Sequence, residues 1–257
     1  MAWELALVLV LGLSIGSFLN VCIWRLPRGQ SLLYPPSSCP SCGHRLGALD
    51  LVPVFSYLFL KGKCRYCQRN ISPAYPLVEL TTAVYFTACW QHFGLSWDVV
   101  SAWVLGSLLL AISVIDLEHY LIPDVLVVSG VIIGSLIAGL DSWARLKTAW
   151  AAGAAGWVFM ALVYWGSLLF LGQEGLGWGD VKLSAMLGVF LGPQKAALAV
   201  FLAFVTGGVA GAYLLLRGRK GRKDPIPFGP FLALGALLAF FWGQTVIDWY
   251  IRLLFYQ

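Results

Sequence analysis

Residues 96–140 read SWDVVSAWVLGSLLLAISVIDLEHYLIPDVLVVSGVIIGSLIAGL. The stretches 96–115 and 122–140 are almost entirely apolar, and the acidic residues Asp116, Glu118 and Asp124 lie around their junction. A transmembrane helix needs about 20 predominantly apolar residues, so each stretch is long enough to cross a bilayer. The sequence therefore predicts two membrane-spanning helices joined by a tight polar connection.

The rest of the chain repeats this pattern. Of the 257 residues, 60% are hydrophobic and only 11% are charged, whereas a soluble domain carries about 25% charged residues. Apolar stretches occur at residues 3–23, 76–93, 96–115, 122–140, 149–171, 181–191, 196–216 and 231–250. The sixth is about half a bilayer long, so it needs shielding by neighbouring helices. We expect an all-α polytopic membrane protein with about eight transmembrane helices.

Basic residues predict the orientation of these helices. They concentrate in residues 25–69 and 217–223, which lie on one side of the membrane if all eight stretches cross it. Because cytoplasmic loops carry the excess of Lys and Arg, we expect the N-terminus outside and the long loop in the cytoplasm. Contact with anionic membrane lipid then accounts for the net charge of +5. Aromatic residues do not interleave with the basic ones, so nucleic-acid binding is not expected.

The one long polar region comprises residues 25–75. Its frequent prolines exclude a continuous helix and predict a small module built from loops. Within it, residues 51–60 read LVPVFSYLFL, an apolar run that is too short to cross a bilayer. Two placements are open for this run: it lies at the membrane surface, or it forms the core of the module.

Four cysteines predict what organises this module. Cys39 and Cys42 form one C-x-x-C pair, and Cys64 and Cys67 form a second. This spacing is typical of a zinc ribbon, in which each pair supplies two thiolates to one tetrahedral zinc. Four thiolates leave no open position on the metal, so we expect a structural zinc and a surface role for His44. Disulfides, redox-active thiols and free cysteines are the alternatives, of which disulfides are disfavoured in a reducing cytoplasm.

Two acidic segments on the predicted cytoplasmic side are candidates for catalysis. One is residues 116–124, and the other is the G-x-G-D sequence from Gly177 to Asp180. Taken alone, the second segment is typical of a helix start with Asp180 as the N-cap. Paired with Asp116 at the same membrane depth, it predicts an aspartyl protease dyad. In such a dyad the ionised carboxylate accepts a proton from water, and the protonated one polarises the scissile carbonyl.

Together these motifs resemble the type IV prepilin peptidases, which are aspartyl proteases of the G-x-G-D group. The matching stretches are residues 16–27, both C-x-x-C pairs, and residues 71–79, 116–124, 177–182 and 225–230. The resemblance implies that Asp116 and Asp180 are the catalytic pair. It also implies that the substrates are prepilins or pseudopilins, cleaved at the cytoplasmic face of the bacterial inner membrane and then N-methylated with S-adenosylmethionine. Ala74 departs from the family, whose members often carry a basic residue there.

On this interpretation residues 1–24 are the first transmembrane helix, residues 25–75 a cytoplasmic zinc-binding module, and residues 76–257 a transmembrane aspartyl protease domain. The sequence has no glycine fingerprint of a nucleotide-binding domain. We therefore expect S-adenosylmethionine at the junction of the module and the membrane, with Glu79 and Arg25 as candidate ligands. The alternative is that both residues only anchor span ends.

Two other functions compete with this interpretation. A peptidase without methyltransferase activity would share the acidic segments, but the shorter relatives of that kind lack the cysteine module. A membrane thiol-redox or metal-handling protein would account for the cysteines and leave the paired aspartates unexplained.

Overall fold

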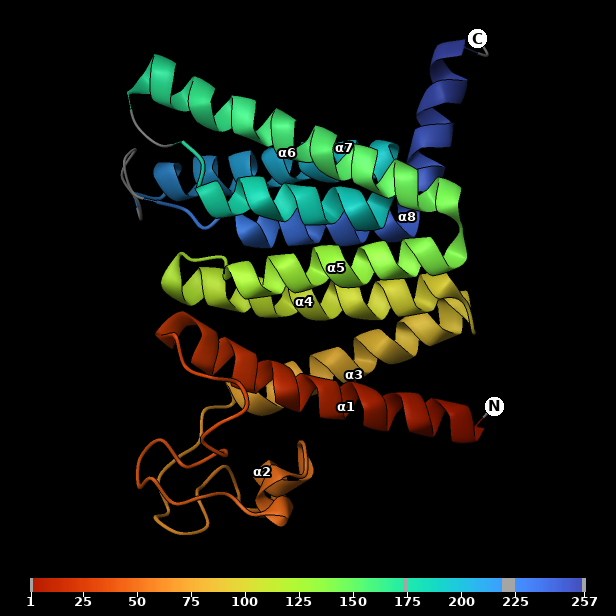
Figure 1. Cartoon of the computed structure of the whole chain (residues 1–257). Coiled ribbons are helices and arrows are strands. Elements are labelled where there is room, and N and C mark those ends of the chain that lie inside the picture. Colours follow the sequence, from red (N-terminus) through yellow and green to blue (C-terminus); the bar gives the residue numbers. More distant parts are fainter. Residues whose placement is uncertain (1, 173–174, 219–224, 256–257) are drawn as a thin grey trace. The chain divides into compact units, whose positions relative to one another are not determined.

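The computed structural model describes residues 2–172, 175–218 and 225–255, and their regular structure is helical. The long helices are α1 (Ala2–Arg25), α3 (Ala74–Phe93), α4 (Trp97–His119), α5 (Asp124–Asp141), α6 (Trp143–Leu171), α7 (Trp178–Leu216) and α8 (Gly229–Phe255). The short helices η1 (Leu26–Arg28), η2 (Ala48–Leu51) and α2 (Phe55–Phe59) lie between α1 and α3 (Figure 1). The predicted all-α class is confirmed. Residues 219–223 of the predicted basic loop lie outside the described residues.

Six helices in the described part of the chain are long and apolar enough to cross a membrane: α1, α4, α5, α6, α7 and α8. The chain is therefore a multi-pass membrane protein. The sequence predicts eight stretches, and the difference has two sources. The stretch at 76–93 forms α3, which is not among these six helices. Its twenty residues include Glu79 and three threonines, which make it less apolar. The stretches at 181–191 and 196–216 both belong to α7.

The chain divides within α4 into two compact units, Met1–Ser107 and Leu108–Gln257. In the first unit α1 packs closely against α3. A Cβ added to Gly12 or Gly16 of α1 would lie 2.6 Å from the Cα of Ala83 or Glu79, respectively. Only glycine permits such a close approach. The contact therefore fixes the position of α3 relative to α1, and with it the two points between which the long polar region runs.

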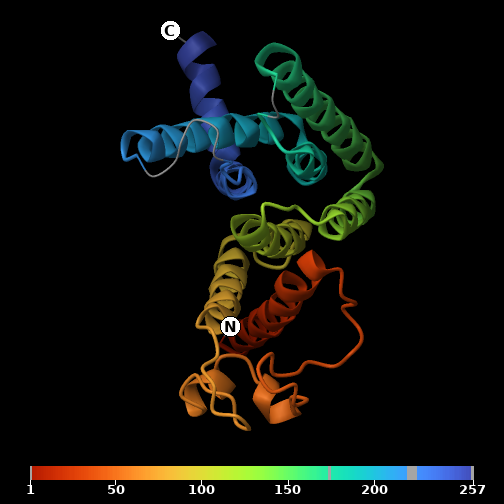
Figure 2. The same ribbon diagram turned by 90° about the vertical axis from the view of Figure 1, so that its left-hand side faces the viewer.

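In the second unit, α7 folds back on itself at Gly192. There φ is 72° and ψ is 175°, a conformation that is essentially restricted to glycine, and Pro193 follows. Both ends of α7 lie on one side of this unit and the bend lies on the other (Figure 1), and the segments before and after the bend run in different directions (Figure 2). The interruption between the apolar stretches 181–191 and 196–216 is therefore a single non-helical residue, Gly192, within α7.

The first segment of α7 has the shielding that its short length requires. Nearly all of its residues from Asp180 to Leu191 are buried. A Cβ added to Gly188 would lie 2.4 Å from the carbonyl oxygen of Ala152, so α6 packs directly on the α7 backbone. Asp180 thus stands at the end of a helix that is enclosed by protein.

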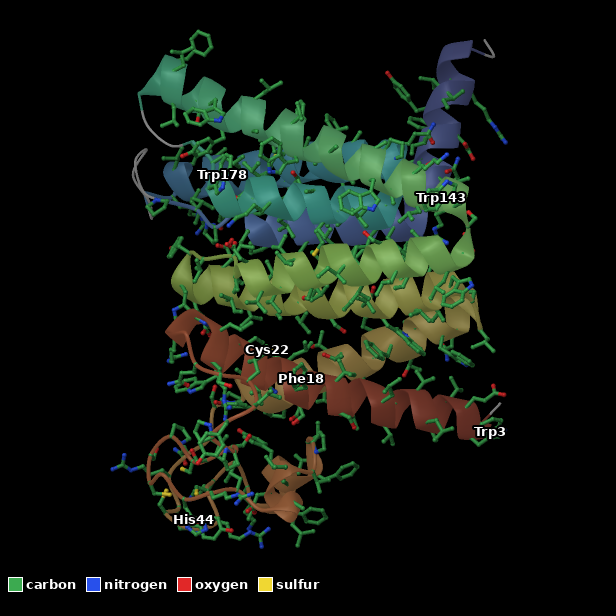
Figure 3. All side chains as sticks on the ribbon, in the orientation of Figure 1. Trp3, Phe18, Cys22, His44, Trp143 and Trp178 are labelled. Carbon is green, nitrogen blue, oxygen red and sulfur yellow. The ribbon has the colours of Figure 1, made fainter. Side chains whose placement is uncertain are left out.

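Tryptophans mark the two ends of the second unit. Trp143 begins α6 and Trp178 begins α7, and they lie at opposite ends of the helices (Figure 3). Both side chains are exposed. Tryptophan is enriched at both membrane–water interfaces. Exposed tryptophans at the two opposite ends of these helices are therefore expected if the helices cross a bilayer.

Candidate active site and metal centre

The four predicted zinc ligands converge in the first unit. The Sγ atoms of Cys39, Cys42, Cys64 and Cys67 all lie within 4.8 Å of one another. Those of Cys39 and Cys67 are 3.9 Å apart, and a tetrahedron with zinc–sulfur bonds of about 2.3 Å has sulfur atoms about 3.8 Å apart. The cluster therefore fits one zinc ion with four thiolate ligands. Such a site holds the module together and has no open position for catalysis.

The backbone builds the two halves of this cluster in the same way. The Cys39 N–H donates to the carbonyl of His44, and the Gly43 N–H donates back to the carbonyl of Cys39, both at 2.9 Å. In the second half Cys64, Arg69 and Gln68 repeat this pattern with the same distances. Gly43 and Gln68 both have a positive φ, which turns the chain after each C-x-x-C pair. The module therefore contains two matching turns, each presenting two sulfurs, as the zinc-ribbon prediction requires.

The turn geometry also prepares a thiolate. Burial acts to raise the pKa of the Cys39 thiol, but hydrogen bonds from the backbone N–H groups of Cys42 and Ser41, together with those from the Cys64 and Cys42 thiols, outweigh it and lower this pKa to about 7. A lowered pKa favours the deprotonated form that binds metal. His44 is exposed and stacks on Tyr66, with ring centroids 3.6 Å apart, which agrees with the predicted surface role.

Arg25 and Glu79, the candidate ligands of the methyl donor, contact the module. The buried Arg25 guanidinium donates to the carbonyl oxygens of Ser31 and Pro35, at 2.8 and 2.7 Å. The buried Glu79 carboxylate accepts a hydrogen bond from the Val54 N–H at 2.7 Å. These two side chains therefore tie the module to the end of α1 and to the second turn of α3.

Asp116 lies in the last turn of α4, because this helix continues past the predicted end of the apolar stretch to His119. Its side chain is buried, with 6% of the residue surface exposed. Its Oδ2 accepts a hydrogen bond from the N–H of Gly229 at 2.9 Å. Gly229 is the first residue of α8. A helix N-terminus carries partial positive charge and unpaired N–H groups, so this position stabilises a carboxylate.

Asp180 is the third residue of α7, and the prediction that it is the N-cap is wrong. The helix begins one turn earlier, at Trp178, with Gly177 as the N-cap. Asp180 is buried like Asp116, and its Oδ2 accepts a hydrogen bond from the Gly177 N–H at 3.2 Å. An acidic residue stabilises a helix N-terminus both at the N-cap and at the third helical position. The carboxylate of Asp180 is therefore compatible with either start of α7.

The two aspartates are close enough for their negative charges to repel each other. Each has one oxygen held by a backbone N–H group at a helix N-terminus, α8 for Asp116 and α7 for Asp180. The Oδ1 of Asp180 is buried and has no hydrogen-bond partner among the described residues. A buried polar atom without a partner costs free energy and marks a place where a further group binds. Two neighbouring carboxylates of this kind can share a proton and activate water.

The remaining charged groups of these segments face outward. Lys182 forms an ion pair with Asp124, which joins the second turn of α7 to the start of α5. Glu118 is exposed and lies 3.9 Å from His119. The two acidic segments therefore lie close together at two places in this unit. One is the buried pair of Asp116 and Asp180, and the other is the partly exposed ion pair of Asp124 and Lys182.

Gly229 has no role that sequence patterns predict, although it lies in the matching stretch 225–230. A Cβ on Gly229 would lie 2.8 Å from the Asp116 Oδ2, so glycine is required for the carboxylate to sit where it does. The P-x-P-x-G-P sequence of this stretch was the one feature of the sequence that could have pointed to Gly229. It could not reveal the contact, because Gly229 and Asp116 are 113 residues apart.

Two models of protein families match the chain. The model of the bacterial peptidase A24 N-terminal domain matches residues 10–93, and that of the type IV leader peptidase family matches residues 103–212. No solved structure is significantly similar to the chain.

Curated relatives match the chain over nearly its whole length. A prepilin leader peptidase/N-methyltransferase of Stutzerimonas stutzeri is 38% identical over 95% of this chain and 92% of its own. Proteins of the same name from Bacillus subtilis (strain 168) and Aeromonas salmonicida are 37% and 36% identical, covering 97% and 96% of this chain and 98% and 93% of their own. This chain belongs to the type IV leader peptidase family.

Proposed function

We propose that the chain is an aspartic endopeptidase that removes the leader of type IV prepilins or pseudopilins and then N-methylates the new N-terminus. The names of the relatives, which match both ends of the chain, support both activities. The observation that carries the peptidase activity is the buried pair of Asp116 and Asp180, with one oxygen of each held by a backbone N–H group.

In the proposed mechanism the pair shares one proton. The ionised carboxylate accepts a proton from a water molecule, and the resulting nucleophile attacks the carbonyl carbon of the scissile bond. The protonated carboxyl group donates a hydrogen bond to the carbonyl oxygen as negative charge develops there, and a carboxyl group then gives its proton to the leaving amine. The Gly229 and Gly177 N–H groups each fix one oxygen, so the second oxygen of each aspartate is left for these transfers.

We place this reaction at the cytoplasmic face of the bacterial inner membrane. The support is the distribution of basic residues, which lie on the same side of the predicted topology as the segments with Asp116 and Asp180. A prepilin leader is basic and precedes an apolar helix, so the bond to be cut lies where a cytoplasmic segment enters the membrane. The enclosed first segment of α7 offers protein, not lipid, beside an unwound substrate.

The test of the catalytic pair is the replacement of each aspartate by asparagine. Asp116→Asn and Asp180→Asn should each abolish cleavage of a prepilin peptide, because an amide cannot exchange the proton. Glu118→Gln is the matched control: it removes a carboxylate from the exposed face of the same turn and should leave cleavage intact. Zinc content, measured on each variant, reports whether the first unit stays folded. Substantial cleavage by either aspartate variant would overturn the assignment.

We propose that zinc has a structural role and that residues 25–75 serve the methyltransferase activity, while residues 76–257 carry proteolysis. S-adenosylmethionine supplies an electrophilic methyl group, and Glu79 and Arg25 are the candidate ligands. A carboxylate suits the cationic groups of this donor, and a guanidinium suits its carboxylate. Both side chains also hold the module in place.

Two variants of Glu79 separate donor binding from positioning. Glu79→Gln keeps an oxygen that can accept the hydrogen bond of the Val54 N–H but removes the negative charge, whereas Glu79→Ala removes both. If the charge binds the donor, Glu79→Gln loses binding of S-adenosylmethionine and methylation while zinc content and cleavage stay normal. Unchanged donor affinity in Glu79→Gln, with a loosened module in Glu79→Ala, would leave Glu79 with the positioning role alone.

A further inference from the structure

The apolar run at residues 51–60 does not form the core of the zinc module. Its residues 55–59 form the short helix α2, its first residue ends η2, and several of its large apolar side chains are exposed. These are Leu51, Val52, Phe55, Leu58 and Phe59, which we call the α2 patch. Phe59 is the extreme case, with 84% of its surface exposed. An exposed apolar cluster of this kind on a small polar module indicates a surface that binds a partner.

A hydrogen bond fixes the α2 patch relative to α3, the helix that packs along α1. The N–H of Val54, at the start of α2, donates to the carboxylate of Glu79 in α3. Glu79 lies five residues after Ala74, the first residue of α3. At 1.5 Å per residue this places the contact about 7 Å along the helix from its start. Figure 1 agrees. Along the direction of the long helices, α2 lies at the same position as the first part of α3, and not beyond the end at which α3 begins.

The charges next to the α2 patch complement an anionic membrane surface. Lys61 and Lys63 follow the apolar run directly, and both are exposed. Aromatic and aliphatic residues on one surface, with lysines beside it, are typical of segments that lie in the headgroup region with their apolar side chains about 5–10 Å deep. Lysines near such a surface are attracted to anionic lipids.

We propose that the α2 patch inserts into the interfacial layer of the bilayer, with Lys61 and Lys63 against anionic lipid headgroups. The partner is lipid because both ends of the module are already tied to helices at the membrane, by Arg25 at the end of the membrane-spanning helix α1 and by Glu79 of α3, which packs along α1. The patch therefore continues a surface that faces the bilayer. The zinc module is then held at the membrane by α1, by α3 and by the lipid itself. This inference depends on the membrane topology and not on the identity of the catalytic residues.

Photocrosslinking of the full-length protein in vesicles tests the proposal. The vesicles contain phosphatidylcholine and phosphatidylglycerol, and a photoreactive phenylalanine analogue replaces Phe59. Because the Phe59 side chain is almost fully exposed, this change disturbs no packing. Tyr66 is the comparison position, an aromatic residue of the same module whose ring contacts His44 and whose hydroxyl donates a hydrogen bond to Asp50. His44 lies on the part of the module away from α2 (Figure 3). Phe18, exposed in the middle of α1, is the positive control for lipid contact.

We expect phospholipid adducts at positions 59 and 18 and none above the dark control at position 66, read by mass spectrometry of the irradiated protein. Omission of phosphatidylglycerol should lower the adduct yield at position 59 and leave the yield at position 18 unchanged. Adducts of position 59 only with protein, or no adducts there while position 18 reacts, would overturn the proposal. Equal lipid labelling at positions 59 and 66 would also overturn it, because the α2 patch would then have no special role.

Discussion

Gly229→Ala is the sharpest test of the proposed active site, because it shifts the Asp116 carboxylate and leaves the chemical structure of this side chain unchanged. The added Cβ would lie 2.8 Å from the Asp116 Oδ2, and an ordinary contact requires about 3.4 Å or more. The carboxylate is the free end of a side chain, so it moves aside at little cost to folding. The movement stretches the hydrogen bond from the Gly229 N–H, which is 2.9 Å long in the native structure.

The size of the effect follows from that hydrogen bond. A hydrogen bond to a charged group contributes about 1.5–3 kcal/mol. If its whole contribution is lost from the transition state, the rate falls by about tenfold for each 1.4 kcal/mol, or roughly 10- to 150-fold in total. Because the carboxylate keeps part of its interaction after a small shift, we expect a loss near the lower end of this range. The stability of the protein should change little.

The assay is cleavage of a prepilin peptide under single-turnover conditions, followed by mass spectrometry. Gly166→Ala is the matched control, because no heavy atom lies within 4 Å of its added Cβ and it lies inside α6, five residues before Leu171. It should cleave at the native rate. A native cleavage rate in Gly229→Ala would refute the argument that this N–H group positions Asp116. An equal loss in Gly166→Ala would show that activity responds to any change in the membrane helices.

Three further changes test other parts of the structure. Gly192→Ala should destabilise the protein by about 1–3 kcal/mol, because alanine tolerates a φ of 72° poorly, and thermal unfolding in detergent measures the loss. Joint replacement of Cys39 and Cys42 by serine should remove the zinc, about one ion per chain in the native protein, as measured by elemental analysis. Lys182→Met breaks the partly exposed ion pair with Asp124 and should cost less than about 1 kcal/mol of stability, read from the same unfolding experiment.

Much of the fold is readable from the sequence because it depends on local properties. Apolar length predicts where helices cross a bilayer, and this reasoning found α1, α4, α5, α6 and α8 close to their observed positions. The zinc cluster was equally accessible, because a C-x-x-C pair places two sulfurs in one turn whatever surrounds it. The aspartates were found because carboxylates beside a membrane are rare and costly.

What the sequence did not predict depends on contacts between distant segments. The Gly229 N–H reaches Asp116 across 113 residues, and no local pattern contains that information. The exact start of α7 was also missed, because Asp180 is a good residue for two neighbouring positions at a helix N-terminus and hydropathy does not distinguish them. The apolar run at 51–60 had two possible placements, and only the fold of the module showed that its side chains are exposed.

The contact between Gly229 and Asp116 also bears on how the protein is made. Gly229 leaves the ribosome 113 residues after Asp116, which at bacterial rates of synthesis of roughly 5–20 residues per second is a delay of about 6–23 seconds. During that time α4 is already in place and its carboxylate lacks the backbone donor that holds it. The proposed catalytic pair is therefore completed only when α8 arrives, so a nascent or truncated chain in the membrane carries Asp116 without its support.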